Sequence, residues 1–408
     1  MEGSGMKHAK SALWFTIGST IYLLCQWLLS FLVVRLSGYE DAGALSLAMS
    51  ISNVFFIFAT FSMRTHQVAD IEDDTPSGVY VTSRVFTTGL AYGCVIIFGF
   101  ANHYRPRTLS VLLLYCLFRA TEAAADVLHG IDQKKGRLDA AGKSGALRGA
   151  AFLAAFVLTL RLGGSLAAAC LTMFVAAALV VALYDVPIAY SLSPFRLCFD
   201  RKRTTELLFI CAPLMLGSLC NTVMGTIPRY VLERLQGSEA LGYFASVATP
   251  VLIVQVASSY LYAPLVPSFA ELARRGDRKG FSRLVRRVCI LIACLSAAAL
   301  AGGAVLGEYA LSVLFGNAIR PYAYLLLPAV VCTVLTAFTW FIATLLTVLG
   351  DRKGILFASA AALLATMAGA VPLIRQFELQ GANYCNLLGL SVYLALLLLR
   401  YAHEMKSL

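Results

Sequence analysis

Residues 35–43 read Arg-Leu-Ser-Gly-Tyr-Glu-Asp-Ala-Gly, and residues 234–242 read Arg-Leu-Gln-Gly-Ser-Glu-Ala-Leu-Gly. An arginine, a leucine, a glutamate and two glycines recur at identical spacing, with a constant offset of 199 residues. Each copy follows a long apolar run, which starts near Leu13 or near Ala212, and each precedes a second apolar run. Internal repeats of apolar helices are typical of membrane transporters, so the chain is predicted to consist of two related halves.

The composition supports a membrane protein. Hydrophobic residues make up 59% of the chain and charged residues only 13%, against about 25% charged residues in soluble domains. Spans of about 20 apolar residues are expected to be helices, because lipid offers the backbone no hydrogen-bond partners. Twelve such spans are predicted, at residues 13–34, 42–63, 83–101, 108–128, 140–160, 165–184, 207–228, 241–266, 284–306, 322–348, 355–374 and 383–400.

Lysine and arginine predict the topology. Placing the N-terminus in the cytoplasm puts roughly three times as many basic residues on the cytoplasmic side as on the opposite side, as the positive-inside rule requires. Both termini are then cytoplasmic, and span one is interpreted as an uncleaved signal anchor. The net charge of +11 follows from this topology and does not argue for a nucleic-acid partner.

Six spans in each half keep the two copies of the repeat on one membrane face, so the halves are predicted to be related by a parallel pseudo-two-fold axis. The expected fold is therefore an all-α polytopic membrane protein with two six-helix lobes. The lobes are predicted at 1–184 and 207–408, joined by an irregular cytoplasmic connector at 185–206 that contains Pro187 and Pro194.

Ionisable residues inside membrane spans are costly and mark functional sites. Arg119, Glu122 and Asp126 in span four have spacings that place them on one helical face. Span five carries Arg148 at a depth similar to that of Glu122. Two interpretations are open and compatible: Glu122 and Arg148 form an ion pair between the two spans, and Arg119 faces a water-filled cavity and holds an anionic substrate.

Polar and small residues form further patterns in the spans. Hydroxyl and amide side chains share helical faces in spans one, two and seven, where they either line a cavity or bind helices together; they include Ser19, Tyr22, Gln26, Asn53 and Asn221. The pairs Gly89/Gly93 and Gly145/Gly149 are interpreted as helix contacts.

No metal centre, cofactor or catalytic group is expected. The five histidines are scattered and no two cysteines have CxxC spacing. The basic segment 268–290 is interpreted either as an interfacial helix on anionic lipid or as ordinary cytoplasmic charge. The acidic run at Asp70, Glu72, Asp73 and Asp74 is interpreted as a solvated turn.

Three stretches resemble the polysaccharide transporter family, which contains the O-antigen and capsule flippases of the multidrug/oligosaccharidyl-lipid/polysaccharide exporter superfamily. They are the repeat beginning at Arg35, residues 118–134 (Phe-Arg-Ala-Thr-Glu-Ala-Ala-Ala-Asp-Val-Leu-His-Gly-Ile-Asp-Gln-Lys), and residues 227–233 (Ile-Pro-Arg-Tyr-Val-Leu-Glu). The resemblance covers nearly the whole chain.

The resemblance implies a flippase in the bacterial cytoplasmic membrane. It implies two lobes around a central cavity that alternates between inward- and outward-open states, and an undecaprenyl-pyrophosphate-linked oligosaccharide as substrate. Cationic cavity residues would hold the pyrophosphate; the matching candidates are Arg119, Arg148, Arg35, Arg64 and Arg229. The other expected partners are anionic membrane lipids, a coupling proton or sodium ion, and polysaccharide polymerase machinery.

Three other functions stay open. An ion-coupled multidrug or cation antiporter of the same superfamily would need an exposed acid, for which Glu122 or Asp126 could serve. The related flippase for the peptidoglycan lipid precursor has extra spans that 408 residues do not accommodate. A membrane polysaccharide polymerase usually needs a large outer loop with catalytic groups, and the predicted outer loops are short.

Overall fold

The computed structural model describes residues 2–70, 75–197 and 199–407, with the side chains of 11–70, 75–197 and 199–406. All its regular elements are helices: α1 Glu2–Ser37, α2 Tyr39–Thr60, α3 Met63–Ala69, α4 Ser77–Ala101, α5 Pro106–Lys134, α6 Leu138–Arg161, α7 Leu166–Val180, η1 Val181–Asp185, α8 Val186–Leu192, α9 Arg201–Gln236, α10 Ser238–Tyr262, η2 Ala263–Leu265, α11 Val266–Arg274, α12 Arg278–Phe315, η3 Asn317–Leu325, α13 Leu326–Leu349 and α14 Arg352–Ser407.

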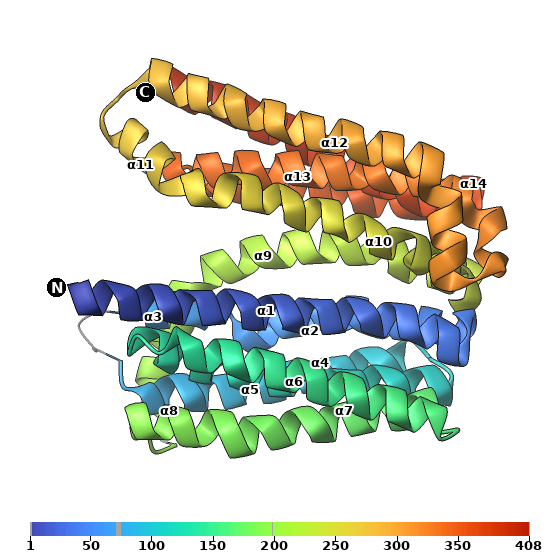
Figure 1. Cartoon of the computed structure of the whole chain (residues 1–408), viewed down its shortest axis with the longest axis horizontal. Coiled ribbons are helices and arrows are strands. Elements are labelled where there is room, and N and C mark those ends of the chain that lie inside the picture. Colours follow the sequence, from blue (N-terminus) through green and yellow to red (C-terminus); the bar gives the residue numbers. More distant parts are fainter. Residues whose placement is uncertain (1, 71–74, 198, 408) are drawn as a thin grey trace. The chain divides into compact units, whose positions relative to one another are not determined.

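The chain forms two compact units, Met1–Leu219 and Cys220–Leu408, which we call unit 1 and unit 2. Unit 1 holds α1 to α8 and the first half of α9, and unit 2 holds the remaining helices (Figure 1). The predicted connector 185–206 is less irregular than expected. Helix α8 occupies its first part and α9 begins at Arg201, so the described non-helical residues are 193–197, 199 and 200.

Among the described residues, ten helices are long and apolar enough to cross a membrane, which makes the protein a multi-pass membrane protein. Two features account for the difference between these ten helices and the twelve predicted spans. Span 108–128 lies in α5, which is not among these ten helices. Spans 355–374 and 383–400 lie together in α14, which is interrupted at Glu378 by a backbone with φ 50° and ψ −128°.

The repeated segment forms the same turn twice. Gly38 alone separates α1 from α2, and Gly237, its counterpart at offset 199, alone separates α9 from α10. Their φ values are 91° and 88°, with ψ near 180°, in a region that is essentially restricted to glycine. The recurring glycine is therefore explained by an abrupt reversal between two long helices.

The acidic run is described only at Asp70, since residues 72–74 lie outside the described part of the chain. The prediction of a solvated turn was wrong for Asp70, whose side chain is bound by neighbouring groups. Its carboxylate lies 3.4 Å from Lys134 Nζ and accepts hydrogen bonds from the Thr75 backbone and the Tyr80 hydroxyl. It thus ties the segment after α3 to α5.

Glycines bring α1 and α6 into contact within unit 1. A Cβ atom on Gly142 would lie 2.3 Å from the backbone oxygen of Trp14, and one on Gly18 would lie 1.8 Å from that of Gly142. Gly145 and Gly149 also face α1, which confirms the interpretation of that pair. Gly89 and Gly93 have no atom within 4 Å of a Cβ position, so their interpretation as a contact within the described structure was wrong.

We expect Gly142→Ala to destabilise the protein by about 1–3 kcal/mol, because the added methyl group would push two backbones apart. Gly89→Ala is the matched control, since it adds the same group at an exposed position in α4. It should be neutral or slightly stabilising, because alanine favours helix over glycine by roughly 0.5–1 kcal/mol. Thermal unfolding of both purified variants tests the contrast, and equal melting temperatures would contradict the close α1–α6 contact.

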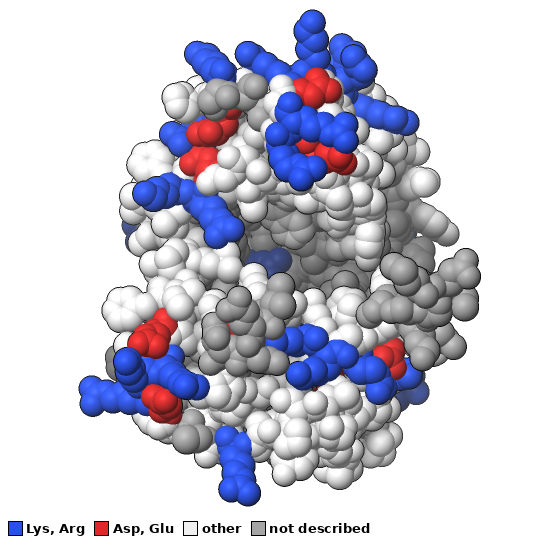
Figure 2. All heavy atoms as spheres, turned by 90° about the vertical axis from the view of Figure 1, so that its left-hand side faces the viewer, with Lys and Arg blue, Asp and Glu red and all other residues white. Residues whose placement is uncertain are grey.

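Basic side chains gather at one end of each unit (Figure 2). In unit 1 they flank the turn between α5 and α6, and in unit 2 they flank the turn between α11 and α12. The second group lies on exposed positions of α12 while Phe281, Val285 and Val288 face the interior. We call these the basic ends of unit 1 and unit 2.

Candidate functional site

Helix α5 carries a continuous polar stripe through unit 1. Arg119, Glu122, Asp126, His129 and Gln133 follow spacings of three and four residues, which place them on one helical face over about 21 Å. The helix packs against α2, α4, α6 and α7, so this face lies among neighbouring helices. The stripe holds two polar networks, one around Glu122 and one around Asp126.

The first network surrounds Glu122, which is 7% exposed. Arg119 forms an ion pair with this carboxylate from the same helix, and Gln26 of α1 donates a hydrogen bond to it at 3.3 Å. Gln26 also donates to the Tyr22 hydroxyl at 3.0 Å. Arg119 is further held by the Asn53 side-chain oxygen at 3.5 Å and lies 4.2 Å from the centre of the Phe56 ring.

The predicted ion pair between Arg148 and Glu122 is not formed. Its guanidinium lies 5.4 Å from the centre of the Tyr22 ring, and within the described part of the chain it forms no ion pair with a carboxylate. The Arg148 residue is 7% exposed, and its Nε is buried without a hydrogen-bond partner. Glu122 and Arg148 were matched because they were expected at a similar depth in the membrane. Glu122 pairs instead with Arg119, which lies one helical turn away on the same helix.

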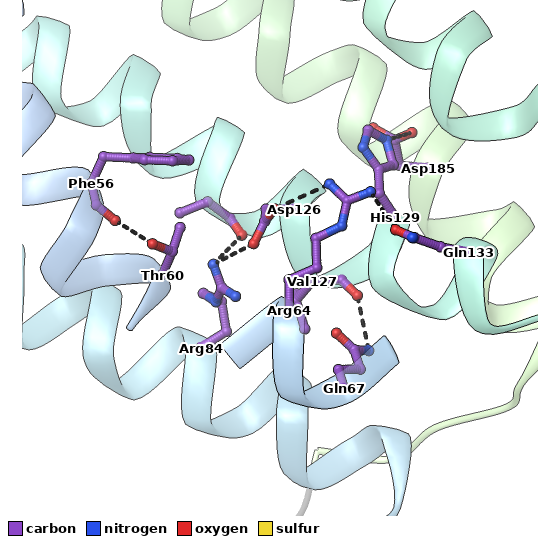
Figure 3. Close-up of polar contacts among 11 residues, drawn as sticks. Phe56, Thr60, Arg64, Gln67, Arg84, Asp126, Val127, His129, Gln133 and Asp185 are labelled. Atoms are coloured by element: carbon purple, nitrogen blue, oxygen red, sulfur yellow. Dashed lines mark hydrogen bonds and ion pairs between the residues drawn. The ribbon is translucent and has the colours of Figure 1, made fainter. Parts of the chain in front are cut away.

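The second network surrounds Asp126, as Figure 3 shows. Arg84 of α4 approaches one carboxylate oxygen at 3.0 Å, and Arg64 of α3 approaches the other at 3.3 Å. Arg64 also donates to the Gln133 side chain at 3.0 Å. Arg84 is 1% exposed and donates to the Ala123 carbonyl at 3.3 Å. One carboxylate therefore serves two arginines.

A break between α2 and α3 positions Arg64. Phe61 and Ser62 have φ values of 49° and 55°, so two consecutive residues other than glycine adopt the left-handed conformation. Each such residue costs on the order of 1–3 kcal/mol. The break ends α2 at Thr60 and starts the short helix α3, which turns the Arg64 side chain towards α5.

A pocket of about 420 Å³ opens beside this second network within unit 1. We call it the α3–α5 pocket. Its polar lining comes from Arg64, Asp126, Gln133 and the hydroxyl-bearing Thr60, Ser62 and Thr65, and its apolar lining from Phe56 and Val68. The side chain of Arg64 is 26% exposed, whereas that of Arg84 is 2% exposed. Arg64 is thus the arginine that an incoming molecule can reach.

The structure brings together only some of the predicted site residues. Arg119, Glu122, Arg148, Tyr22, Gln26 and Asn53 meet in the first network, and Asp126 and Arg64 meet in the second. Arg35 lies in the exposed last turn of α1, 5.9 Å from the Phe31 ring. Arg229 and Asn221 belong to unit 2, where Asn221 donates a hydrogen bond to Ser359 at 3.4 Å. Ser19 of unit 1 has no polar contact with the described residues.

Arg84 and Gln133 were missed by the sequence analysis. The third span was predicted to start at 83, which made Arg84 a boundary charge, but α4 begins at Ser77 and places Arg84 two turns inside the helix. Gln133 continues the three- and four-residue spacing of α5 beyond the predicted span. Extending that periodicity past residue 128 would have identified it.

The two networks hold more positive than negative charge. Four arginines, at 64, 84, 119 and 148, face two carboxylates, at 122 and 126, which leaves two positive charges. Among the described residues no group of histidine, cysteine or acidic side chains could hold a metal ion. A bundle of apolar helices around a polar interior of this kind defines a polytopic membrane protein of the transporter class.

Residues 9–273 match the family described as "Polysaccharide biosynthesis protein", and the chain belongs to this family. It is 22% identical over 303 residues to the capsular polysaccharide biosynthesis protein CapF of Staphylococcus aureus, covering 74% of this chain and 76% of that protein. These matches confirm the resemblance to the polysaccharide transporters.

Solved structures with the same fold are membrane transporters and a flippase. The chain is similar to the inward-facing conformation of a multidrug resistance MATE family transporter of the MOP superfamily, with a TM-score of 0.72, 13% identity, and 97% and 98% of the two chains covered. It is also similar to the lipid II flippase MurJ in an inward closed conformation, with a TM-score of 0.75, 11% identity, and 96% and 87% covered. Identities this low establish the fold alone.

Proposed function

We propose that the protein is a flippase that moves undecaprenyl-pyrophosphate-linked oligosaccharide across the bacterial cytoplasmic membrane by alternating access. The family match supports a role in polysaccharide biosynthesis, and the shared fold supports a membrane transporter. The observation that carries the substrate class is the excess of two positive charges in the two networks around Glu122 and Asp126. A buried site with this charge is stabilised by an anion.

Arginine suits recognition of a pyrophosphate. Its planar guanidinium offers parallel N–H donors to phosphate oxygens, and such charge-assisted hydrogen bonds are about twice as strong as neutral ones. Arg64 lines the α3–α5 pocket and keeps part of its side chain exposed. Arg119 lies seven residues from Asp126 on the same face of α5, about 10 Å further along the helix. We assign initial contact with the headgroup to Arg64, and later contacts to Arg119 and Arg148.

We infer the orientation of the pocket in the membrane from the basic ends of the units. Lysine and arginine mark cytoplasmic ends in membrane proteins, so the basic end of unit 1 is assigned to the cytoplasm, together with both termini. The α3–α5 pocket contains Gln133, which lies in the last turn of α5 next to this end. A lipid-linked oligosaccharide assembled in the cytoplasm would therefore meet the pocket before the first network.

A leaflet-resolved assay tests the proposal. Lipid-linked oligosaccharide is placed in proteoliposomes, and the fraction that an external lectin can reach is followed with time. We expect the protein to accelerate the appearance of the glycan on the opposite leaflet relative to protein-free vesicles, and inorganic pyrophosphate to slow it by competition. Equal rates with and without protein would refute the flippase assignment.

A cation antiporter is the alternative function, and the fold alone is compatible with it. Such a transporter needs an acid in the substrate pocket that is free to bind a cation, but Asp126, which lines the α3–α5 pocket, and Glu122 are each engaged by arginine. The same vesicles should therefore show no drug-cation uptake driven by a proton or sodium gradient. Uptake of a cationic dye with no movement of the glycan would favour the antiporter.

A further inference from the structure

A buried acidic cluster lies beside the α3–α5 pocket and is not part of its lining. His129 and Asp132 lie one turn apart on α5, and Asp185 ends η1. The His129 ring nitrogen Nε2 lies 3.2 Å from Asp185 Oδ1 (Figure 3). The three residues are 5%, 1% and 1% exposed, so each is withdrawn from solvent.

Two carboxylate oxygens in the cluster are buried without a partner. Neither Asp132 Oδ1 nor Asp185 Oδ2 has a hydrogen-bond partner within the described part of the chain. An unpartnered buried polar atom costs about 1–3 kcal/mol, and more when it is charged. A buried carboxylate without a partner lowers this cost by binding a proton, which removes its charge, and a second carboxylate nearby increases its affinity for that proton.

The surrounding charges do not neutralise the cluster. Asp132 interacts electrostatically with Asp185, with Arg137 and Asp139 at the start of α6, and with Arg64 of α3. Arg137 is already paired with Asp139 at 2.9 Å, and Arg64 with Asp126. His129 also interacts with Arg64 and Arg148, and Tyr184 lies in the field of Asp132 and Asp185. The nearby arginines thus serve other carboxylates first.

Asp132 lies in the last turns of α5, beyond the apolar span predicted at 108–128. Burial raises the pKa of Asp132 to about 7, and the negative charge of Asp185 adds to the increase. Arg137 and Arg64 oppose the increase. Asp132 can therefore gain and lose a proton in the physiological pH range.

The backbone at Asp185 is unusual as well. Val181–Asp185 form a π-helical turn inside an otherwise continuous α7–α8 helix. Such turns are rare and frequently occur at functional sites. Here the turn ends at Asp185 and packs against α5, which brings the carboxylate to His129.

We propose that Asp132 and Asp185 bind one exchangeable proton, that His129 orients Asp185 for this purpose, and that an anion entering the α3–α5 pocket increases the affinity for the proton. Arg64 provides the link, since its positive charge acts on both sites. An anion that neutralises Arg64 removes a charge that opposes protonation, and by reciprocity the proton strengthens anion binding. The link rests on the proposed function, whereas the proton site itself does not.

Infrared spectroscopy of the full-length protein in detergent tests the proton site. We expect the band of a protonated carboxylic acid to be present at about pH 5 and to disappear by about pH 9. Asp132→Asn should remove this titrating band. Glu206→Gln is the matched control, because Glu206 is an exposed carboxylate in unit 1 with no ion pair to the described residues. A band that titrates identically in the Asp132→Asn variant would overturn the proposal.

The pH dependence of the apparent melting temperature is a second readout. An acid whose pKa is raised by folding stabilises the protein at low pH, and this contribution is lost as the pH rises through the folded-state pKa. We expect the parent and Glu206→Gln to lose stability between about pH 4 and pH 7, where only the folded state keeps this proton, and Asp132→Asn to lose less. An equal slope in all three proteins would overturn the assignment to Asp132.

Sodium is the competing ligand. Loss of the infrared band on adding sodium chloride at constant pH, with no effect of potassium chloride, would overturn the proton assignment in favour of a sodium site. Retention of the band in both salts supports the proton.

Calorimetric titration with inorganic pyrophosphate tests the link. Repeating it in buffers of different ionisation enthalpy counts the protons taken up on binding. Pyrophosphate exchanges protons of its own near pH 7, and this contribution is common to all three proteins. We expect the parent and Glu206→Gln to take up more protons on binding than Asp132→Asn, by up to one. Equal proton exchange in all three proteins would refute the link. Absence of binding would refute the proposed anion site and leave the infrared result to decide on the proton site.

Discussion

Arg64→Ala is expected to slow translocation of the lipid-linked glycan about 10- to 100-fold while leaving the protein folded. Arg64 is the most accessible arginine of the second network and lines the α3–α5 pocket. Charge-assisted hydrogen bonds contribute about 1.5–3 kcal/mol, and about 1.4 kcal/mol corresponds to a tenfold change in affinity. Asp126 keeps Arg84 as a partner in the variant, so no buried charge is left alone.

Arg64→Lys should give an intermediate rate, because lysine retains the charge but not the two parallel donors. Arg105→Ala is the control. It removes an exposed arginine that immediately precedes Pro106, at the N-terminal end of α5, whereas Gln133 of the pocket lies at the C-terminal end. The leaflet-resolved assay measures the rates, and thermal unfolding shows whether each variant is folded. A folded Arg64→Ala protein that flips as fast as Arg105→Ala would remove Arg64 from substrate binding.

Asp126→Asn is expected to destabilise unit 1 by about 3–5 kcal/mol, the range measured when one partner of a buried ion pair is removed. Arg84 would be the group left without a counter-charge. Its residue is 1% exposed, and its Nε and Nη2 atoms already lack hydrogen-bond partners in the described structure. Arg64 would be affected less, because Gln133 remains as a partner.

The double variant Arg84→Met/Asp126→Asn should recover much of this loss, since it buries neither charge. Apparent melting temperatures of the single and double variants in one detergent measure the recovery. If Asp126→Asn alone melts at the parental temperature, Arg84 does not depend on Asp126 and the second network is not held together by this pair.

The sequence predicted the helices and the polar face of α5 because both follow from local periodicity. Eight of the twelve predicted spans fall within one helix of the structure, and the other four, 42–63, 165–184, 241–266 and 322–348, cross a helix boundary. Arg119, Glu122 and Asp126 share one face as expected. The recurring Gly38 and Gly237 also marked equivalent turns. These features depend on residues within a few turns of one another, which spacing rules describe well.

The pairing of charges could not be predicted in the same way. Depth along a helix says nothing about its rotation, so Arg148 was matched with Glu122 although its guanidinium lies over the Tyr22 ring. Arg84 was not recognised as a buried site residue because the start of α4 was predicted six residues too late. The break at Phe61 and Ser62 has no glycine to signal it, yet it decides which side chain reaches the pocket.

The polar stripe of α5 also bears on how the chain enters the membrane. A charged residue at the centre of a helix opposes insertion by about 2.5–3.5 kcal/mol on translocon-derived scales, and α5 carries Arg119, Glu122 and Asp126. Helix α4 is synthesised first and supplies Arg84, the closest partner of Asp126. We therefore expect α4 to wait at the translocon until α5 has been made, so that the two helices pass into the lipid together as a hairpin with their charges already paired.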